Sequence, residues 1–203
     1  MNLLFAEGPA AGGSPESVAL LAETLRSRGH FVATAGGGNW DGSERQWTGL
    51  RWWLRGMQSL LSVPVDLIHV HDRRWAVAGL LAARRAKVPA VITLRDIGLN
   101  CPISTGYLWE GPERPTDCGQ WRLWHRCAPW FGRTYHAPKG YRWRLAVRYA
   151  LLRVERRAVA RFDRVICPSQ GLLHHYVGAI PRARWAVIPS PVRPVPDHRC
   201  LHG

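Results

Sequence analysis

The chain has 203 residues, which suits one large domain, and it contains no run of about 18 apolar residues that could span a membrane. Its N-terminus lacks the basic and long apolar regions of a secretion signal, so we expect a cytoplasmic protein. The net charge is +14, nearly all from arginine, which fits nucleic acid, acidic lipid headgroups or a phosphate-bearing substrate. A GC-rich genome could produce the same arginine bias, and the five cysteines are not expected to form disulfides in a reducing compartment.

Strand and helix patterns alternate along the chain. Short apolar runs rich in β-branched residues predict six strands, at residues 3–6, 30–35, 66–71, 90–94, 163–169 and 185–188. Apolar residues at helical spacing predict helices between them, at residues 14–28, 47–61, 74–87, 141–162 and 170–178. This alternation predicts an α/β fold with a doubly wound, mainly parallel sheet. Residues 97–141 lack periodicity and are predicted to form a long, functional loop.

Polar residues follow the third and fourth predicted strands, His71 with Asp72 and Arg95 with Asp96. Ligands of open α/β sheets bind outside the carboxyl ends of the strands, so these are candidate site residues. His69 and His71 are expected to point to opposite faces of their strand, which would make them poor joint metal ligands. His71 is then the site candidate and His69 a hydrogen-bonded core residue. Asp96 is the candidate catalytic residue, as a hydrogen-bond acceptor or base for a substrate hydroxyl. Its structural alternative is to cap the loop or to pair with Arg95.

Two further features favour ligand binding, and each has a structural alternative. Gly12 and Gly13 precede a helix start, where the backbone could approach an anionic ligand and offer free N–H groups. Their alternative role is a tight turn. Ser169 lies between a strand and a helix, where its hydroxyl could donate to a ligand or cap the helix.

The cysteines and the longest helix raise two other possibilities. Cys101, Cys118 and Cys127, with His125 nearby, suggest zinc, but their spacings contain no C-x-x-C pair, so no metal site and no cofactor is predicted. The predicted helix 141–162 has an arginine-rich face and an apolar face. Such a helix could lie on a membrane surface, and the alternative is that its apolar face packs on the sheet.

Several short motifs resemble a known family when they are read in order. They are Gly12-Gly13 before a capped helix, Arg28-Gly29-His30, Asp66 to His71, Thr93 to Asp96, Asn100-Cys101-Pro102, Val165 to Ser169 and Val187 to Val192. Together they are similar to the amino-terminal domain of the GT-B glycosyltransferases of family 4. The resemblance divides the chain into a domain at residues 1–193 and a linker-like tail at residues 194–203.

The resemblance implies a Rossmann-like sheet that forms one half of a two-domain enzyme. We therefore expect the acceptor-binding half of a glycosyltransferase, which transfers a sugar from a nucleotide-sugar to a glycan or lipid-linked acceptor. It should be inactive alone, and a nucleotide-sugar should bind only with a donor-binding domain from another chain. The resemblance also places Gly12 and Gly13 at the acceptor and the sugar diphosphate. Arg95 stands where the family has a histidine near the reacting centre, so binding should survive better than turnover.

The alternative function is a basic nucleic-acid-binding module, which the charge of +14 and the eleven tryptophans suggest. No RNA- or DNA-binding motif accompanies them, so nucleic acid is the less favoured partner. A small hydrolase or reductase is less favoured again, because neither a G-x-S-x-G nor a G-x-G-x-x-G motif occurs. With a lipid-linked acceptor, the protein would contact the inner face of the membrane from the cytoplasm.

Overall fold

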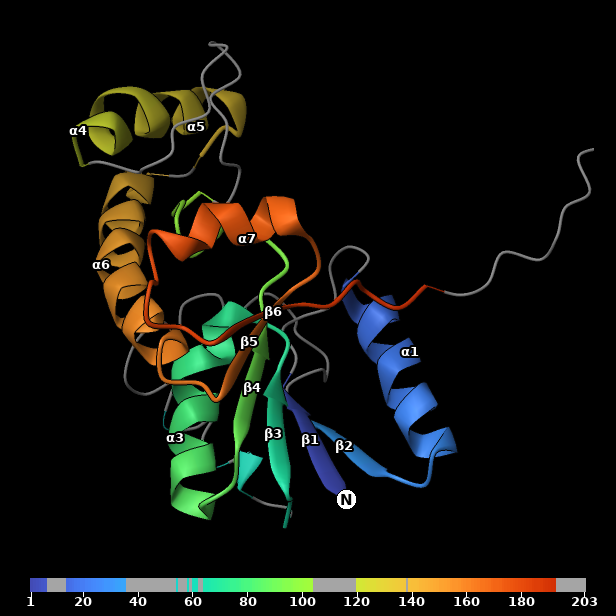
Figure 1. Cartoon of the computed structure of the whole chain (residues 1–203). Coiled ribbons are helices and arrows are strands. Elements are labelled where there is room, and N and C mark those ends of the chain that lie inside the picture. The colour runs from blue at the N-terminus through green and yellow to red at the C-terminus, as the bar shows by residue number, and fades with distance from the viewer. Residues whose placement is uncertain are drawn as a thin grey trace, which may run out of the picture.

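The computed structural model describes residues 1–6, 14–35, 54, 58, 60, 61, 64–103, 120–137 and 139–192, and the structural statements below concern these residues. Six strands form one parallel sheet in the order β2-β1-β3-β4-β5-β6 (Figure 1). They are β1 (Asn2–Ala6), β2 (Phe31–Ala35), β3 (Leu67–Val70), β4 (Ala90–Thr93), β5 (Arg164–Cys167) and β6 (Trp185–Val187). All six predicted strands are present, and the predicted parallel α/β sheet is confirmed.

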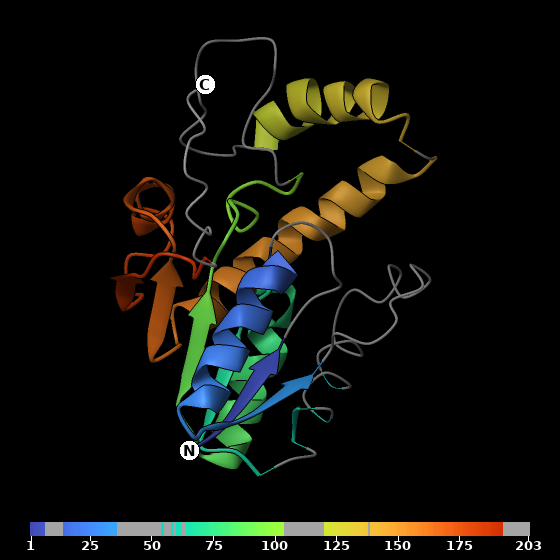
Figure 2. The same ribbon diagram turned by 90° about the vertical axis from the view of Figure 1, so that its right-hand side faces the viewer.

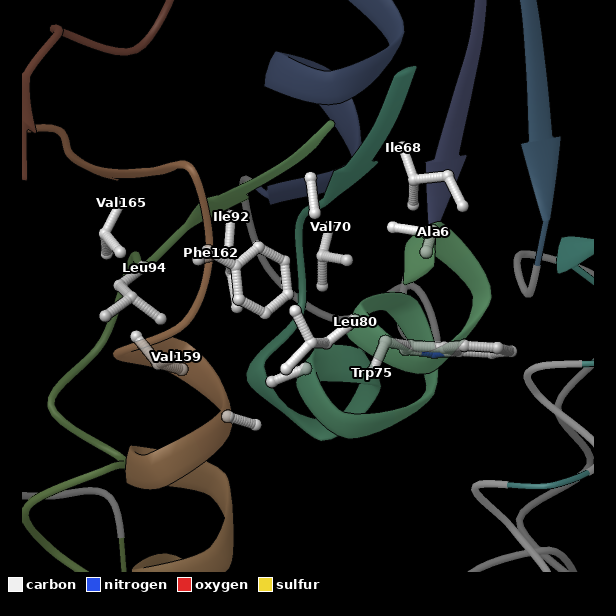
Figure 3. Close-up of a cluster of buried hydrophobic side chains, with 14 of the residues drawn as sticks. Ala6, Ile68, Val70, Trp75, Leu80, Ile92, Leu94, Val159, Phe162 and Val165 are labelled. Atoms are coloured by element: carbon white, nitrogen blue, oxygen red, sulfur yellow. The ribbon is translucent and has the colours of Figure 1, made fainter. Parts of the chain in front are cut away.

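Helices cover both faces of the sheet, as a doubly wound fold requires. They include α1 (Ser14–Ser27), α3 (Ala76–Ala86), α6 (Tyr141–Val159) and α7 (Gln170–Val177). On one face, α1 packs through Val18 and Ala22 onto Leu3 and Phe5 of β1. On the other face, α3 and α6 pack together over the larger core, part of which Figure 3 shows. Burial of both faces explains why the strands are almost continuously apolar.

The strand order places a topological switch point between β1 and β3. The chain passes from β1 to its neighbour β2, and then returns to the other side of β1 to form β3. In doubly wound sheets, ligands bind at such a switch point, outside the carboxyl ends of the strands. His71 directly follows β3 at this edge. The loop with Gly12 and Gly13, which follows β1, lies outside the described residues.

The ends of the helices follow from local chemistry. Gly29, with a φ of +80°, ends the turn after α1, and its N–H donates to the carbonyl of Arg26 at 3.0 Å. The predicted helix 74–87 begins as a 3-10 turn, η2 (Arg73–Trp75), before it continues as α3. Asp72 caps this turn, because its Oδ1 accepts from the N–H of Arg74 at 2.8 Å. The cap fixes the chain immediately after His71.

The prediction of a loop over residues 97–141 is wrong for part of that range. A continuous helical segment occupies it, made of α4 (Gln120–Arg122), the π turn η3 (Leu123–Cys127) and α5 (Ala128–Thr134). In the π turn, the N–H of Ala128 donates to the carbonyl of Leu123, five residues earlier. This shift interrupts the usual helical period, and Pro129 follows directly, so the sequence pattern does not read as a helix.

Some predictions fall outside the described residues. They concern the tail at residues 194–203 and most of the predicted helix 47–61, of which Leu54, Gln58, Leu60 and Leu61 are described and Leu60 is fully buried. Within the described part of the chain, none of the helices is both long and apolar enough to cross a bilayer.

Candidate functional site

The carboxyl edge of the sheet brings most of the predicted site residues together. His71 follows β3, Arg95 and Asp96 follow β4, and Ser169 follows β5, and these three strands are neighbours in the sheet. Because the strands are parallel, these residues all lie at one edge. Gly12 and Gly13 cannot be placed beside them, since they lie outside the described residues.

His71 is a buried, uncharged polar residue beside the switch point. Its side chain is 5% exposed and meets the ring of Phe5 edge-on, with ring centroids 4.7 Å apart. Among the described residues, neither ring nitrogen has a hydrogen-bond partner. Burial, reinforced by electrostatic interactions with His69 and with the charge of Arg95, lowers the pKa of His71 far below its usual value, so the ring is neutral. A neutral imidazole presents one donor and one acceptor, and either of them can form a hydrogen bond with a hydroxyl group.

The prediction that His69 and His71 point to opposite faces is wrong. Side chains two positions apart on a strand share a face, and the two ring centroids are 3.9 Å apart. The prediction that His69 is a hydrogen-bonded core residue is confirmed, because its Nε2 lies 2.8 Å from Oγ1 of Thr93. Burial and the charge of Arg95 lower the pKa of His69 to about 4. The two rings form a buried, uncharged pair.

Asp96 is held at the start of a turn by Arg73, a residue that no sequence motif marks as part of the site. Its Oδ1 accepts from Nε of Arg73 at 3.2 Å and from the N–H of Gly98 at 2.8 Å. The predicted alternative role, capping of the loop, is therefore confirmed, and the ion pair is made with Arg73. The carboxylate is nevertheless 54% exposed, so it remains accessible to a ligand. At Gly98, a Cβ would lie 2.0 Å from Nε of Arg73, so a larger residue would displace this guanidinium from Asp96.

Two helices hold the rest of this turn. The hydroxyl of Tyr176, on α7, donates to the carbonyl of Asp96, and the side chain of Asn100 donates to the carbonyl of His175. Nε of Arg156, on α6, donates to the carbonyl of Leu99 at 2.7 Å. The backbone of the turn is thus fixed by contacts from α6 and α7. These contacts have no signal in the sequence, since no local pattern links residues so far apart.

A buried charge cluster lies behind the turn. Glu155 of α6 is only 3% exposed and binds Arg148 through both oxygens, at 2.7 and 3.0 Å. Burial raises the pKa of Glu155 to about 7, and the positive charge of Arg73 opposes this rise. Beside it, the carboxylate of Asp72 binds the guanidinium of Arg74. Two arginine–carboxylate pairs, Arg148 with Glu155 and Arg74 with Asp72, therefore lie behind the turn.

The remaining predicted features have structural roles. Ser169 caps α7, because its Oγ accepts from the N–H of Leu172 at 3.2 Å, which confirms the capping alternative. Its hydroxyl hydrogen is still free to donate to a ligand. Cys101 and Cys127 are free thiols, whereas Cys118 lies outside the described residues. In the described part of the chain, no group of three or more histidine, cysteine or acidic side chains could hold a metal ion.

The apolar face of the predicted helix 141–162 is used in packing. Leu145 and Leu152 of α6 are buried, and Val159 and the following Phe162 belong to the main core (Figure 3). The alternative that this face packs against the rest of the domain is therefore confirmed. A membrane would have to contact other parts of the surface.

Comparisons with known proteins agree on the family and the fold. The family model described as Glycosyltransferase Family 4 matches residues 11–194. The structure of HepE from Anabaena in complex with UDP-glucose is similar, with a TM-score of 0.55 and 18% sequence identity, and the match covers 95% of this chain and 44% of HepE. HepE in complex with UDP and glucose gives a TM-score of 0.54 and 19% identity, over 95% of this chain and 45% of HepE.

These matches differ in what they establish. At such low identity, the likeness to HepE shows a shared Rossmann-like fold, and this chain spans less than half of the HepE chain. A search among curated proteins finds no significant match. The family model, in contrast, covers most of the sequence, from the start of α1 to beyond β6. The chain therefore belongs to glycosyltransferase family 4, as its motifs predict.

Proposed function

We propose that these 203 residues form the acceptor-binding half of a glycosyltransferase. The complete enzyme would transfer a sugar from a nucleotide-sugar to a glycan or lipid-linked acceptor. Family membership supports the reaction class, and the likeness to HepE, whose structure contains UDP-glucose, supports a nucleotide-sugar donor. Because the chain spans 44% of HepE, we propose that the donor must be bound by a second domain outside these 203 residues, and that these residues are inactive alone.

The observation that carries this proposal is that the ring of His71 is buried and has no hydrogen-bond partner among the described residues. A buried imidazole without hydrogen-bond partners among the described residues costs free energy unless water, a ligand or another part of the chain satisfies it. It lies at the switch point where doubly wound sheets bind ligands. We therefore assign His71 to binding an acceptor hydroxyl.

The neighbouring residues suit the other parts of an acceptor. The guanidinium of Arg95 would bind a phosphate or an acidic group of the acceptor. Asp96 would accept the proton, or a hydrogen bond, from the reacting hydroxyl, since its carboxylate is accessible and its turn is fixed. The hydroxyl of Ser169 would donate to the acceptor, and Gly12 and Gly13 would allow its close approach to the backbone.

Sugar transfer provides the first test. The purified 203-residue chain is incubated with a panel of UDP-, GDP- and dTDP-sugars and with glycan and prenyl diphosphate acceptors. We expect no turnover. Robust transfer by this chain alone would refute the need for a second, donor-binding domain.

The variant His71→Phe provides the second test. Phenylalanine keeps an aromatic ring against Phe5 and removes both unpaired nitrogens, so the variant should unfold at a higher urea concentration, with a gain of about 1–3 kcal/mol. On an array of glycans and prenyl-linked sugars it should lose the binding that the wild-type chain shows. His30→Phe, at the opposite edge of the sheet, is the control and should bind like wild type. Unchanged binding by His71→Phe, or a loss of stability, would contradict the role of His71.

The proposed location follows from the proposed acceptor. A lipid-linked acceptor would place the protein in the cytoplasm, in contact with the inner face of the membrane. The alternative function, nucleic-acid binding, has only the positive charge and the aromatic content in its favour. Family membership gives it no support, so we do not adopt it.

A further inference from the structure

One end of the molecule exposes large aromatic side chains. It consists of α4, η3, α5 and the first turn of α6, which we call the α4–α6 end, at residues 120–144. Trp121 is 66% exposed, Tyr135 54% and Trp143 74%. In the described part of the chain, these are all the tryptophan and tyrosine residues with exposed side chains. Figures 1 and 2 both show this end projecting beyond the carboxyl edge of the sheet.

The same part of the chain carries a large share of the net positive charge. Residues 120–144 contain six arginine and lysine residues and no aspartate or glutamate, against a net charge of +14 for all 203 residues. Five of the six are exposed, namely Arg126, Arg133, Lys139, Arg142 and Arg144. Basic side chains in this number attract a negatively charged surface, at about 1 kcal/mol each near an anionic bilayer.

The helices of this end are already packed without a partner. Leu123 and Cys127 of η3 are buried, and the hydroxyl of Tyr141 donates to the carbonyl of Ala128 at 3.1 Å, which joins α5 to α6. The exposed aromatic side chains are therefore surplus to the internal packing. Tryptophan and tyrosine favour the headgroup region of a bilayer, where an apolar ring and a polar N–H or O–H group are both satisfied.

We propose that the α4–α6 end binds membranes that contain acidic lipids. The projecting shape favours a bilayer over a nucleic acid, because proteins that bind single strands follow the backbone along a groove. In addition, His125 lies against the ring of Trp121, with centroids 5.1 Å apart, so one face of this indole is not open to a stacked base.

The position of this end suits the proposed function, on which this part of the inference rests. Helix α6 runs from the α4–α6 end to Arg156, which contacts the turn that begins at Asp96. The 16 residues from Tyr141 to Arg156 span about 22 Å of helix. A membrane bound at one end of α6 would hold a lipid-linked acceptor within reach of the candidate site at the other.

Flotation with lipid vesicles tests the inference without any sugar substrate. The 203-residue chain is mixed with vesicles of phosphatidylcholine alone, or of phosphatidylcholine with phosphatidylglycerol, at low and at physiological salt. We expect binding only to the acidic vesicles, weakened by salt. The double variants Trp121→Ala/Trp143→Ala and Arg142→Glu/Arg144→Glu should each weaken binding at least tenfold.

Matched variants elsewhere on the surface serve as controls. Phe31→Ala removes an exposed aromatic ring from β2, and Arg28→Glu/Arg182→Glu makes the same change of charge at the amino edge of the sheet. Both should bind vesicles like wild type. Equal losses in test and control variants would overturn the inference, as would an absence of vesicle binding. Displacement of the vesicles by a single-stranded oligonucleotide, bound through the same residues, would also overturn it.

The outcome separates this inference from the proposed function. Loss of sugar binding in His71→Phe with normal flotation would support both. Glycan binding by a chain that does not float would refute the membrane surface alone. Flotation without any glycan binding would refute the acceptor site alone.

Discussion

Replacing the buried Glu155 with glutamine tests how much the burial of this carboxyl group changes the free energy of unfolding as the pH rises. Burial raises the pKa of Glu155 from its ordinary 4.5 to about 7. Between these values the folded protein keeps a proton that the unfolded chain has lost. The stability of the wild type should therefore fall as pH rises through this window, by about 1.4 kcal/mol per pH unit and about 3 kcal/mol in all.

The charged groups that face Glu155 come from three parts of the chain. They are Arg148 on α6, Asp72, Arg73 and Arg74 before α3, and Asp96 in the turn after β4. The arginines favour the ionised form of Glu155, whereas burial and the two aspartates favour the protonated form. The variant Glu155→Gln cannot ionise, so its contribution to stability stays constant across the window. Its stability relative to wild type should therefore increase with pH.

Urea unfolding, followed by circular dichroism at pH 4.5 and at pH 7.5, measures this difference. The variant minus wild-type difference should rise by about 3 kcal/mol between the two pH values. Glu23→Gln makes the same chemical change at an exposed position on α1. Its stability relative to wild type should change by no more than about 0.5 kcal/mol between the two pH values. A Glu155→Gln difference that falls with pH would refute the reasoning, because the bond to Arg148 would then outweigh burial.

Two further predictions concern packing around β3 and β4. Thr93→Val removes the hydroxyl that lies 2.8 Å from Nε2 of His69, and should cost about 1–3 kcal/mol in chemical denaturation, whereas Thr93→Ser keeps the hydroxyl and should cost less. Equal losses would show that the methyl group matters and the hydrogen bond does not. Gly79→Ala would place a Cβ 2.4 Å from Cγ2 of Val70 and should cost about 1–3 kcal/mol, while Gly171→Ala, with its nearest neighbouring atom at 4.0 Å, should gain up to about 1 kcal/mol. Thermal unfolding compares the two, and a fully stable Gly79→Ala would show that α3 packs less closely on β3.

The strands could be predicted because burial on both faces of the sheet requires short, nearly continuous apolar runs in the sequence. β3 and β4 are short apolar runs that lack the alternation of a half-exposed strand. Once the strands are assigned as parallel, the positions of His71 and Asp96 at one edge follow from the topology alone. The family motifs lead to the same sheet and are confirmed by the family model.

Contacts between distant residues could not be predicted in this way. Tyr176 holds the carbonyl of Asp96 from 80 positions away, and Arg156 holds that of Leu99 from 57 positions away. No local pattern specifies such pairs, because they depend on how α6 and α7 pack on the sheet. The helix at residues 120–134 escaped prediction for a local reason, since its π turn shifts the helical period. The face assigned to His71 was a different kind of error, because the strand period of two already places it beside His69.

The candidate site therefore has two parts with different physical character. The turn at Asp96 is completed by the domain itself, because Arg73, the N–H of Gly98 and the hydroxyl of Tyr176 together fix its carboxylate and its backbone. His71 is buried without comparable support among the described residues, so its hydrogen bonds must come from water, from a ligand or from another part of the chain. In the proposed function, a ligand supplies the missing hydrogen bonds of His71, and the fixed carboxylate of Asp96, at the same edge of the sheet, accepts a proton from a hydroxyl group of that ligand. Binding energy should therefore depend mainly on His71, and any rate of transfer mainly on Asp96.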